Sequence, residues 1–578
     1  MALFKLKTPE SVEVFRRRLA DVDALPQLAA LGMLTGLVTA AVILSFRWVM
    51  ELCLSFLPAG DIENFEALSL YARIALVMGG ALTLGFLMNR YTPSARRVGV
   101  VHVMERLSLH QGRLPLRNAV IQFIGGVIAL VSGQSGGREG PAIHLGATAA
   151  SLLGQQFKVP YNSLRTLVAC GTAAAIASSF NTPIAGVIFA MEVVMMEYTI
   201  GSFIPVIIAA VTSTILTQVF FSAEVAFTVG ASFNYSIAEL PYLLLVGILI
   251  GAAAAAYIQL IQRFARLSQL PFWLRICIAG AITAAAAVVF PQVMGVGYDT
   301  VNDIMLTQLS IVLLAALAVT KLITSAAAVG MGMPVGLIGP TFFIGAAIGG
   351  VFGNMLQYWT EADVSIGFYV MLGMCAMMGA ALQAPLAALM AVLEMTTNTQ
   401  LILPAMLTIV IATMTNSQVF KQKSVFISTL NTLGLQYPPS PVTLHMQRVG
   451  VTAIMNRAFV RLPETVEFAE AQAALDQNPS WIVIGGTDIR ALLNPADLNA
   501  FISERGEEGQ QIDLMKMPGQ RMDVTTIGAQ ATVMQVQSAL TRSGMEACCV
   551  TRTTAPMIKP VIGVITQNDI DSYRNKTE

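Results

Sequence analysis

Residues 137–147 read Gly-Arg-Glu-Gly-Pro-Ala-Ile-His-Leu-Gly-Ala, and residues 336–346 read Gly-Leu-Ile-Gly-Pro-Thr-Phe-Phe-Ile-Gly-Ala. Extended to Gly154 and Gly353, the two stretches share four glycines, a proline and an alanine over 18 aligned positions. Such order and spacing indicate an internal repeat rather than chance similarity between two glycine-rich helices. Each stretch also predicts that a helix begins at its Gly-Pro step, because proline is tolerated in a first helical turn.

The repeat continues beyond these two stretches. Pro183 precedes Glu192 by nine residues, and Pro385 precedes Glu394 by the same nine. Because the repeat relates the two glutamates, we expect both to have structural roles. A repeated set of interrupted helices is typical of transporters with inverted halves and a site near the bilayer midplane, where the halves meet.

Composition places most of the chain in a membrane. Of 578 residues, 55% are hydrophobic and 12% are charged, whereas soluble domains carry about 25% charged residues. Mean hydropathy is +0.67 and the net charge is zero, so no basic excess points to nucleic acid. About 32 charged residues lie between Pro26 and Gly434, against about 27 in the much shorter stretch from Leu435 to the end.

These shifts in composition predict four regions: an N-terminal segment 1–25, a membrane domain 26–434, a linker 435–450 and a soluble domain 451–578. The first region carries Arg16-Arg17-Arg18 and no apolar run, which predicts an amphipathic cytoplasmic segment and a cytoplasmic N-terminus. The six cysteines show no C-x-x-C spacing, which indicates a reducing compartment and no metal site.

Region 26–434 contains segments that approach or exceed the roughly 20 apolar residues of a membrane-spanning helix. We expect long helices over Leu28–Leu57, Leu70–Leu87, Leu116–Val131, Phe203–Phe221, Leu240–Ile261, Phe272–Val293 and Leu309–Ala328. Shorter apolar pieces bounded by Gly, Pro or Asn cover Ala142–Leu153, Ile184–Met196, Phe342–Met355 and Leu386–Leu393. The expected fold class is a multi-pass all-α membrane protein with inverted repeats and broken helices, followed by an α+β domain.

The two Gly-Pro helix starts suggest an anion site. The first amides of a helix lack partners and carry the positive end of its dipole, and glycine allows a ligand to approach the backbone closely. Two such ends meeting in a membrane would bind an anion weakly enough to release it. Glu139 lies in the first turn of one of these helices, where its ionised carboxylate would compete with the anion and its protonation would open the path.

The segment Gly137-Arg138-Glu139-Gly140-Pro141 matches the GREGP motif of the CLC chloride channels and chloride/proton exchangers, and Gly336–Pro340 resembles that family's GxFxP motif. The surroundings of Asn181-Thr182-Pro183 and Leu403-Pro404 are also similar, so the resemblance covers roughly 28–434. It implies a homodimer in a lipid bilayer with one chloride pathway in each subunit, protons as a second candidate substrate, and Glu139 as the gate. The retained proline makes the fluoride-exporting branch a poorer match.

The same resemblance identifies departures from the family pattern. Val98 occupies the position of the motif serine, and Phe426 that of the tyrosine whose hydroxyl completes the inner anion site. Anion binding should therefore rely on the backbone amides of Leu337, Ile338 and Gly339. The other expected site residues are Arg138 and Gly140 around the anion, with Gly137, Pro141, Gly336 and Pro340 shaping the two turns.

The route for protons is less complete than the route for the anion. Val193 stands where many exchangers have an internal proton glutamate. We therefore expect a channel-like or weakly coupled protein, with a chloride/proton antiporter as the alternative. Lys321 would raise the local potential for anions, snorkel or pair. His102 and His144 are too isolated in the sequence to suggest a metal site.

Region 451–578 resembles a pair of CBS units, as found in CLC proteins. The ending Gly563-Val564-Ile565-Thr566-Gln567-Asn568-Asp569 carries the Thr and Asp that bind nucleotide in that module, whereas the first unit keeps only Asp497. The resemblance implies either a structural tail or an adenine-nucleotide sensor at Thr566 and Asp569. No other cofactor is expected.

Two other functional classes fit the sequence less well. A CBS-regulated cation channel would require acidic rings or paired acids in the pore, and intramembrane acids are few. An enzyme would require a nucleophile–base set or a metal-ligand cluster, and none is apparent. The expected location is the cell (inner) membrane, with both termini cytoplasmic.

Overall fold

The computed structural model describes residues 25–57, 64–221, 239–306, 309–360, 365–396, 398–435, 446, 449–485, 488–505, 511–552 and 560–577. Almost all of the expected N-terminal segment 1–25, and most of the expected linker 435–450, lie outside these residues. The described chain forms two compact units. The larger is Ala24–Phe157 with Leu164–Pro438, and the smaller is built mainly from Pro439–Glu578.

The larger unit is all helical, and its elements fall into two successive sets. The first set is α2 Leu25–Ser55, α3 Leu70–Asn89, α4 Gly99–Leu109, α5 Leu116–Val131, α6 Glu139–Gln156, α7 Tyr161–Phe180, α8 Pro183–Phe189 and α9 Ile200–Phe220. The second is α10 Leu240–Ala265, α11 Phe272–Val289, α12 Tyr298–Leu306, α13 Ile311–Gly330, α14 Ile338–Thr360, α15 Ile366–Leu382, α16 Pro385–Thr396, α17 Ile402–Met414 and α18 Val425–Thr432.

All seven expected long segments are helical, and nine helices among the described residues are long and apolar enough to cross a membrane. The segment expected over Phe272–Val293 ends earlier, at Val289, because Pro291 begins a separate 3-10 turn. Two interior helices, α7 and α15, did not stand out in the sequence, and almost every residue along them is buried.

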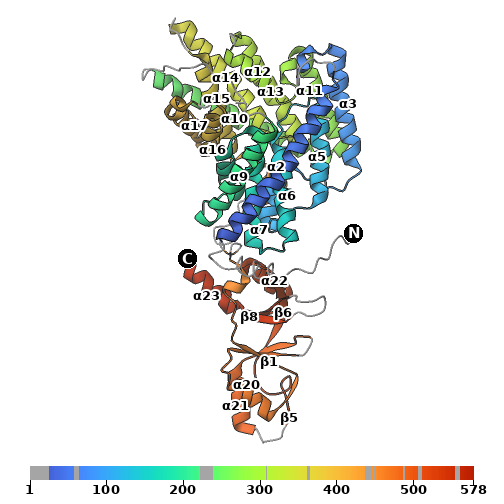
Figure 1. Ribbon diagram of the computed structural model, residues 1–578, viewed down its shortest axis with the longest axis vertical. Coiled ribbons are helices and arrows are strands. Elements are labelled where there is room, and N and C mark those ends of the chain that lie inside the picture. Colours follow the sequence, from blue (N-terminus) through green and yellow to red (C-terminus); the bar gives the residue numbers. More distant parts are fainter. Residues whose placement is uncertain are drawn as a thin grey trace. The chain divides into compact units, whose positions relative to one another are not determined.

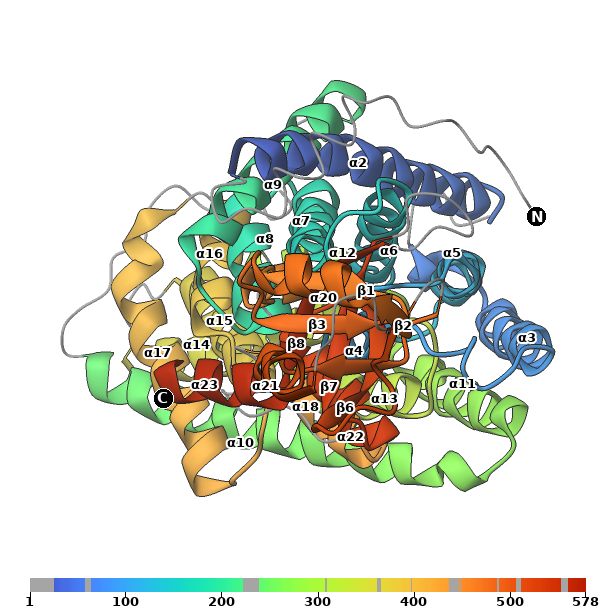
Figure 2. The same cartoon turned by 90° about the horizontal axis from the view of Figure 1, so that it is seen from below.

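Helices that are far apart in sequence lie side by side. In Figures 1 and 2, α2 runs along α9 and α3 runs along α11. The short helices α8 and α16, which the repeat relates, also pack on each other. The two helices that the repeat relates, α8 and α16, are therefore also in direct contact.

Glu192 and Glu394 join α8 and α16 reciprocally. Glu394 accepts hydrogen bonds from the amides of the second and third residues of α8, at 2.9 and 2.7 Å. Glu192 lies in a π-helical extension of α8, η2 (Ala190–Met195), and accepts from the corresponding amides of α16 at 3.4 and 2.8 Å. Each carboxylate thus caps the start of the other helix, which gives both residues a structural role.

The smaller unit is α+β. Its strands are β1 Phe459–Leu462, β2 Thr465–Glu467, β3 Trp481–Ile484, β4 Ala491–Leu493, β5 Gln511–Asp513, β6 Arg521–Gly528, β7 Ala547–Thr551 and β8 Val561–Thr566. Its main helices are α20 Phe468–Leu475, α21 Pro495–Arg505, α22 Val533–Ser543 and α23 Gln567–Thr577. Six strands form one sheet in the order β1-β3-β4-β6-β7-β8, and β2 pairs with β5. A parallel pair followed by an antiparallel pair occurs in β1-β3-β4 and again in β6-β7-β8, so this unit also contains two similar halves.

Candidate functional site

The two glycine turns of the repeat bind each other directly. The Gly137 amide donates to the Gly336 carbonyl at 2.7 Å, and the Gly336 amide donates to the Gly137 carbonyl at 2.6 Å. A Cβ at Gly140 would lie 2.7 Å from Gly336 Cα, which is too close for any side chain. The glycines are therefore required because the two backbones touch, and they join the halves of the larger unit at one point.

Helices α6 and α14 begin at this junction. Their first intrahelical bonds run from the Ala142 amide to the Arg138 carbonyl and from the Thr341 amide to the Leu337 carbonyl, both at 3.0 Å. The amides that precede these have no partner within their helices. Two positive helix ends therefore meet in the interior of the membrane unit, as the sequence predicted.

The Glu139 side chain lies in the space between the two turns. It is fully buried, and its Oε2 would lie against a Cβ built at Gly137. A Cβ at Gly336 would lie 2.9 Å from Oε2, and one at Gly339 would lie 3.1 Å from Oε1. The carboxylate thus lies between the two helix ends, whose free amides suit a negative charge.

Tyr298 holds this carboxylate, and sequence reasoning missed it. The Tyr298 hydroxyl donates to Glu139 Oε1 at 2.7 Å, whereas Oε2 is buried with no hydrogen-bond partner among the described residues. Tyr298 begins α12 directly after Gly297. The glycine-flanked sequence Gly295-Val296-Gly297-Tyr298 was the available signal, but 159 residues separate the phenol from its partner.

Two buried or partly buried cations lie close to Tyr298 and the turn before it. Lys321 is fully buried, and its Nζ donates to the carbonyls of Val293 at 3.1 Å and Gly295 at 2.9 Å. The Lys321 side chain therefore does not reach toward solvent. Its ammonium group binds the backbone of the turn that leads to Tyr298. The Arg138 guanidinium lies 5.6 Å from the Tyr298 ring centre and donates to the Ser179 carbonyl at 3.3 Å.

Apolar side chains occupy the positions at which the family resemblance implies hydroxyl groups. Val98 is the N-cap residue of α4 and makes no side-chain cap hydrogen bond. Phe426 is buried in the first turn of α18, and Leu337 and Ile338 are buried at the start of α14. Apart from Val98, these residues share one apolar cluster, and none of the four side chains offers a polar group to an anion.

Two buried polar groups near this region were not anticipated. The Gln122 side chain accepts from the Gly99 amide at 2.8 Å and donates to the Pro334 carbonyl at 3.0 Å, so it links the start of α4 to the second glycine turn. The Tyr257 hydroxyl lies 2.7 Å from Ser325 Oγ, and both side chains are fully buried. Each contact joins residues distant in sequence, and no motif marks it.

His102 and His144, which are far apart in the sequence, lie together in the structure. His102 Nδ1 and His144 Nε2 are 2.8 Å apart, across the interface between α4 and α6. Both rings are buried. The positions are 42 residues apart, and only the packing of α4 on α6 brings them together. Val193, the expected site of the missing acid, lies in η2, which also packs against α4.

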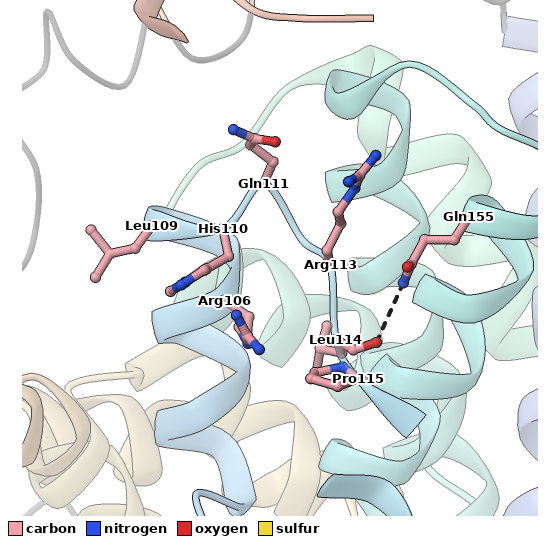
Figure 3. A pocket seen from close by; sticks show the side chains of 8 residues that line it. All are labelled: Arg106, Leu109, His110, Gln111, Arg113, Leu114, Pro115 and Gln155. Atoms are coloured by element: carbon pink, nitrogen blue, oxygen red, sulfur yellow. Dashed lines mark hydrogen bonds between the residues drawn. The ribbon is translucent and has the colours of Figure 1, made fainter. Parts of the chain in front are cut away.

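A pocket of about 360 Å³ opens at the other end of α4. Its wall carries Arg106, His110 and Arg113 from the end of α4 and the following turn, and Gln155 from α6, whose Nε2 donates to the Leu114 carbonyl at 3.3 Å (Figure 3). Burial, with the nearby Arg106 charge, holds the pKa of His110 below its usual range. Two guanidinium groups here favour the approach of anions.

In the smaller unit, Thr566 and Asp569 lie together at the start of α23. The Thr566 amide and hydroxyl both donate to Asp569 Oδ2 at 2.8 Å. In the other half, Asp497 Oδ2 accepts from the Gln520 amide at 3.0 Å. Both acids therefore accept hydrogen bonds from groups of their own unit.

Comparison with known proteins agrees with this architecture. Residues 79–417 match the family described as voltage gated chloride channel. A relative from Ralstonia nicotianae, whose name likens it to the chloride channel protein ClcB, is 31% identical over 66% of this chain and 91% of its own length. The H(+)/Cl(-) exchange transporter ClcA of Yersinia pestis is 28% identical over 69% of this chain and 86% of its own length.

Solved structures share the fold. A slow cyanobacterial Cl-/H+ antiporter superimposes with a TM-score of 0.63 at 20% identity, over 71% of this chain and 99% of that one. A eukaryotic CLC transporter superimposes with a TM-score of 0.58 at 18% identity, over 97% of this chain and 98% of that one. Together with the family match, these findings mean that the chain belongs to the voltage-gated chloride channel family, the CLC family.

Proposed function

We propose that this protein carries chloride across a membrane through a pathway that Glu139 closes and opens. One observation carries the proposal: the Glu139 carboxylate lies between two helix starts that together suit an anion. An ionised carboxylate there competes with chloride, and protonation removes the competing charge. Protonation of Glu139 would therefore link the passage of chloride to the arrival of a proton.

Coupling between the two ions is proposed to be weak. Val193 and Phe426 are buried and apolar, so neither provides a titratable group on the inner side. The alternative is a chloride/proton antiporter, and one observation favours it: a pair of imidazoles is buried between α4 and the gate helix α6. Relatives named as channels and as exchangers both exist.

The remaining proposals concern assembly and regulation. We propose a homodimer in the inner membrane, as the family resemblance implies. Its termini are proposed to be cytoplasmic, because the arginine cluster at residues 16–18 favours a cytoplasmic N-terminus. The C-terminal unit is proposed to be a CBS pair that stabilises the assembly. Adenine nucleotide at Thr566 and Asp569 is the second candidate, and isothermal titration of the purified protein with ATP tests it.

The experiment for the main proposal compares wild-type protein with Glu139→Gln in liposomes. Chloride efflux should rise as the pH falls in wild type, because protonation opens the path. The amide is a neutral mimic of the protonated acid, so Glu139→Gln should keep chloride efflux and lose most of its pH dependence. Absence of chloride flux in the wild type, or unchanged pH dependence in the variant, would contradict the proposal.

A further inference from the structure

The imidazoles of His102 and His144 form a buried polar contact between α4 and α6. His144 is fully buried on α6, and His102 is 3% exposed on α4. Their nitrogens are 2.8 Å apart, which is hydrogen-bonding distance. Most of the residues packed around them, including Val103, Ile143 and Ala147, belong to the large apolar cluster of this unit.

One nitrogen of the pair has no hydrogen-bond partner. His144 Nδ1 is buried and unbonded among the described residues. A neutral imidazole has one N–H and one lone pair, so Nδ1 carries one or the other into an apolar interior, and leaving either unbonded costs free energy. A buried group in that condition suggests a transient partner such as water or a proton donor.

The pair lies beside the part of the pathway that lacks an acid. Helix α4 packs against η2, which contains Val193, and against α18, which contains Phe426. On the gate helix, His144 follows Glu139 by five residues, about 7.5 Å along the axis at the rise of an α-helix. The pair is therefore a titratable group on two packed helices, of which α6 carries Glu139 and α4 contacts the elements that carry Val193 and Phe426.

Several charges surround His102. The nearest ionisable groups acting on it are His144, Arg106, Arg97 and His110. Arg97 is paired with Glu105. The other packed elements carry the following titratable groups: Arg47 and Glu51 of α2, Arg117 of α5, Arg165 of α7, Tyr358 of α14 and Glu192 of η2. The charges that act most closely on His102 are cationic and disfavour an imidazolium there, so protonating the pair requires the charge of a nearby anion to compensate.

From this geometry we propose that His102 and His144 form the inner proton relay of the transport cycle, in place of the absent internal acid. This proposal rests on the proposed function, because Glu139 is the group that receives the proton. A nearby chloride would offset the charge of the loaded relay, which links proton movement to anion occupancy. Because the pair needs a nearby chloride before it takes up a proton, it is protonated in only some transport cycles, which agrees with weak coupling.

The relay step conserves protons and charge. At the start, His102 Nδ1–H donates to His144 Nε2, and His144 carries its own proton on Nδ1. A proton joins His102 Nε2, the Nδ1 proton of His102 passes to His144 Nε2, and the proton on His144 Nδ1 leaves for Glu139 through a transient water. One proton enters and one leaves, and the hydrogen bond remains with its direction reversed.

The test measures both ions on the same liposomes. Wild type, His102→Gln and His144→Gln are reconstituted, a chloride gradient is imposed, and chloride efflux and proton uptake are recorded together. Glutamine keeps a polar group in each place but does not relay protons. We expect proton uptake to fall about tenfold or more, since a positioned proton carrier contributes at least that much, while chloride efflux stays within about twofold. His110→Gln is the matched control: its imidazole lines the pocket, where water can replace it, so both fluxes should persist.

Each outcome decides the matter. Loss of proton uptake with retained chloride efflux in either single variant supports the relay. One of the two variants is therefore enough for the test if the other does not fold. Parallel loss of both fluxes in a monodisperse protein would assign the pair a structural role and overturn the proposal. Unchanged proton uptake in both variants, or no proton uptake in the wild type, would also overturn it. A wild type without chloride efflux would instead refute the proposed function itself.

Discussion

Removing the Tyr298 hydroxyl should loosen the gate without disturbing its surroundings. In Tyr298→Phe the ring that packs beside Arg138 is kept, and only the 2.7 Å bond to Glu139 is lost. A hydrogen bond to a charged group contributes about 1.5–3 kcal/mol. Because Tyr298 is partly exposed, we take the lower end. At about 1.4 kcal/mol for each pH unit, the pH of half-maximal chloride flux should shift by about one unit.

The direction of the shift follows from which form of Glu139 the phenol binds. The hydroxyl donates to the carboxylate, so it stabilises the ionised, closed form. Without it, protonation occurs at higher pH, and the flux curve should move upward by about one unit, with about tenfold more flux on its alkaline side. Flux at low pH should be unchanged, since the gate is already protonated there.

Chloride efflux from liposomes, measured from pH 4.5 to 8, tests this expectation. Tyr242→Phe is the matched control, because its hydroxyl donates to the Phe352 carbonyl at 2.8 Å and not to the gate. A midpoint that does not move, that moves to lower pH, or that moves equally in the control would refute the assignment of Tyr298 as the group that holds Glu139.

Three further outcomes are expected. Gly339→Val should abolish most chloride flux, because a Cβ there would already lie 3.1 Å from the Glu139 carboxylate. Ile338→Ala should reduce the flux only mildly. Similar small losses in both variants would count against binding of the anion by backbone amides. Glu394→Ala should lower the thermal unfolding temperature of the purified protein, since replacing a cap costs about 0.5–2 kcal/mol, and an unchanged temperature would contradict the capping role. A chain ending at Tyr437 should still conduct chloride if it folds and assembles, and a folded but inactive truncation would show that the C-terminal unit is needed for permeation.

The repeat made the main features of the site predictable from sequence. Glycine and proline at matching positions determine the local backbone geometry, so the helix starts at Glu139 and Ile338 could be inferred. The anion-binding role of their amides stays a prediction. The roles of Glu192 and Glu394 followed from the same symmetry.

Contacts across the fold could not be predicted in this way. The bond from Tyr298 to Glu139 joins α12 to α6, and the histidine contact joins α4 to α6. Neither pair has a fixed spacing, because each depends on how two helices pack rather than on one local turn. The interior helices α7 and α15 escaped notice for a related reason: their sequences lack a polar face that would distinguish them from the apolar segments around them.

The paired bonds between Gly137 and Gly336 limit the way this protein can open. They form an isolated bridge at the centre of the larger unit, where two helix starts converge. If the two halves moved apart as rigid bodies at this point, both hydrogen bonds would break in a place without bulk water to replace them. Each unsatisfied group would then cost several kcal/mol. Ion passage here should therefore depend on rotation of one side chain about a stationary backbone joint. A crosslink that fixes the two halves to each other near this joint should leave chloride conduction intact.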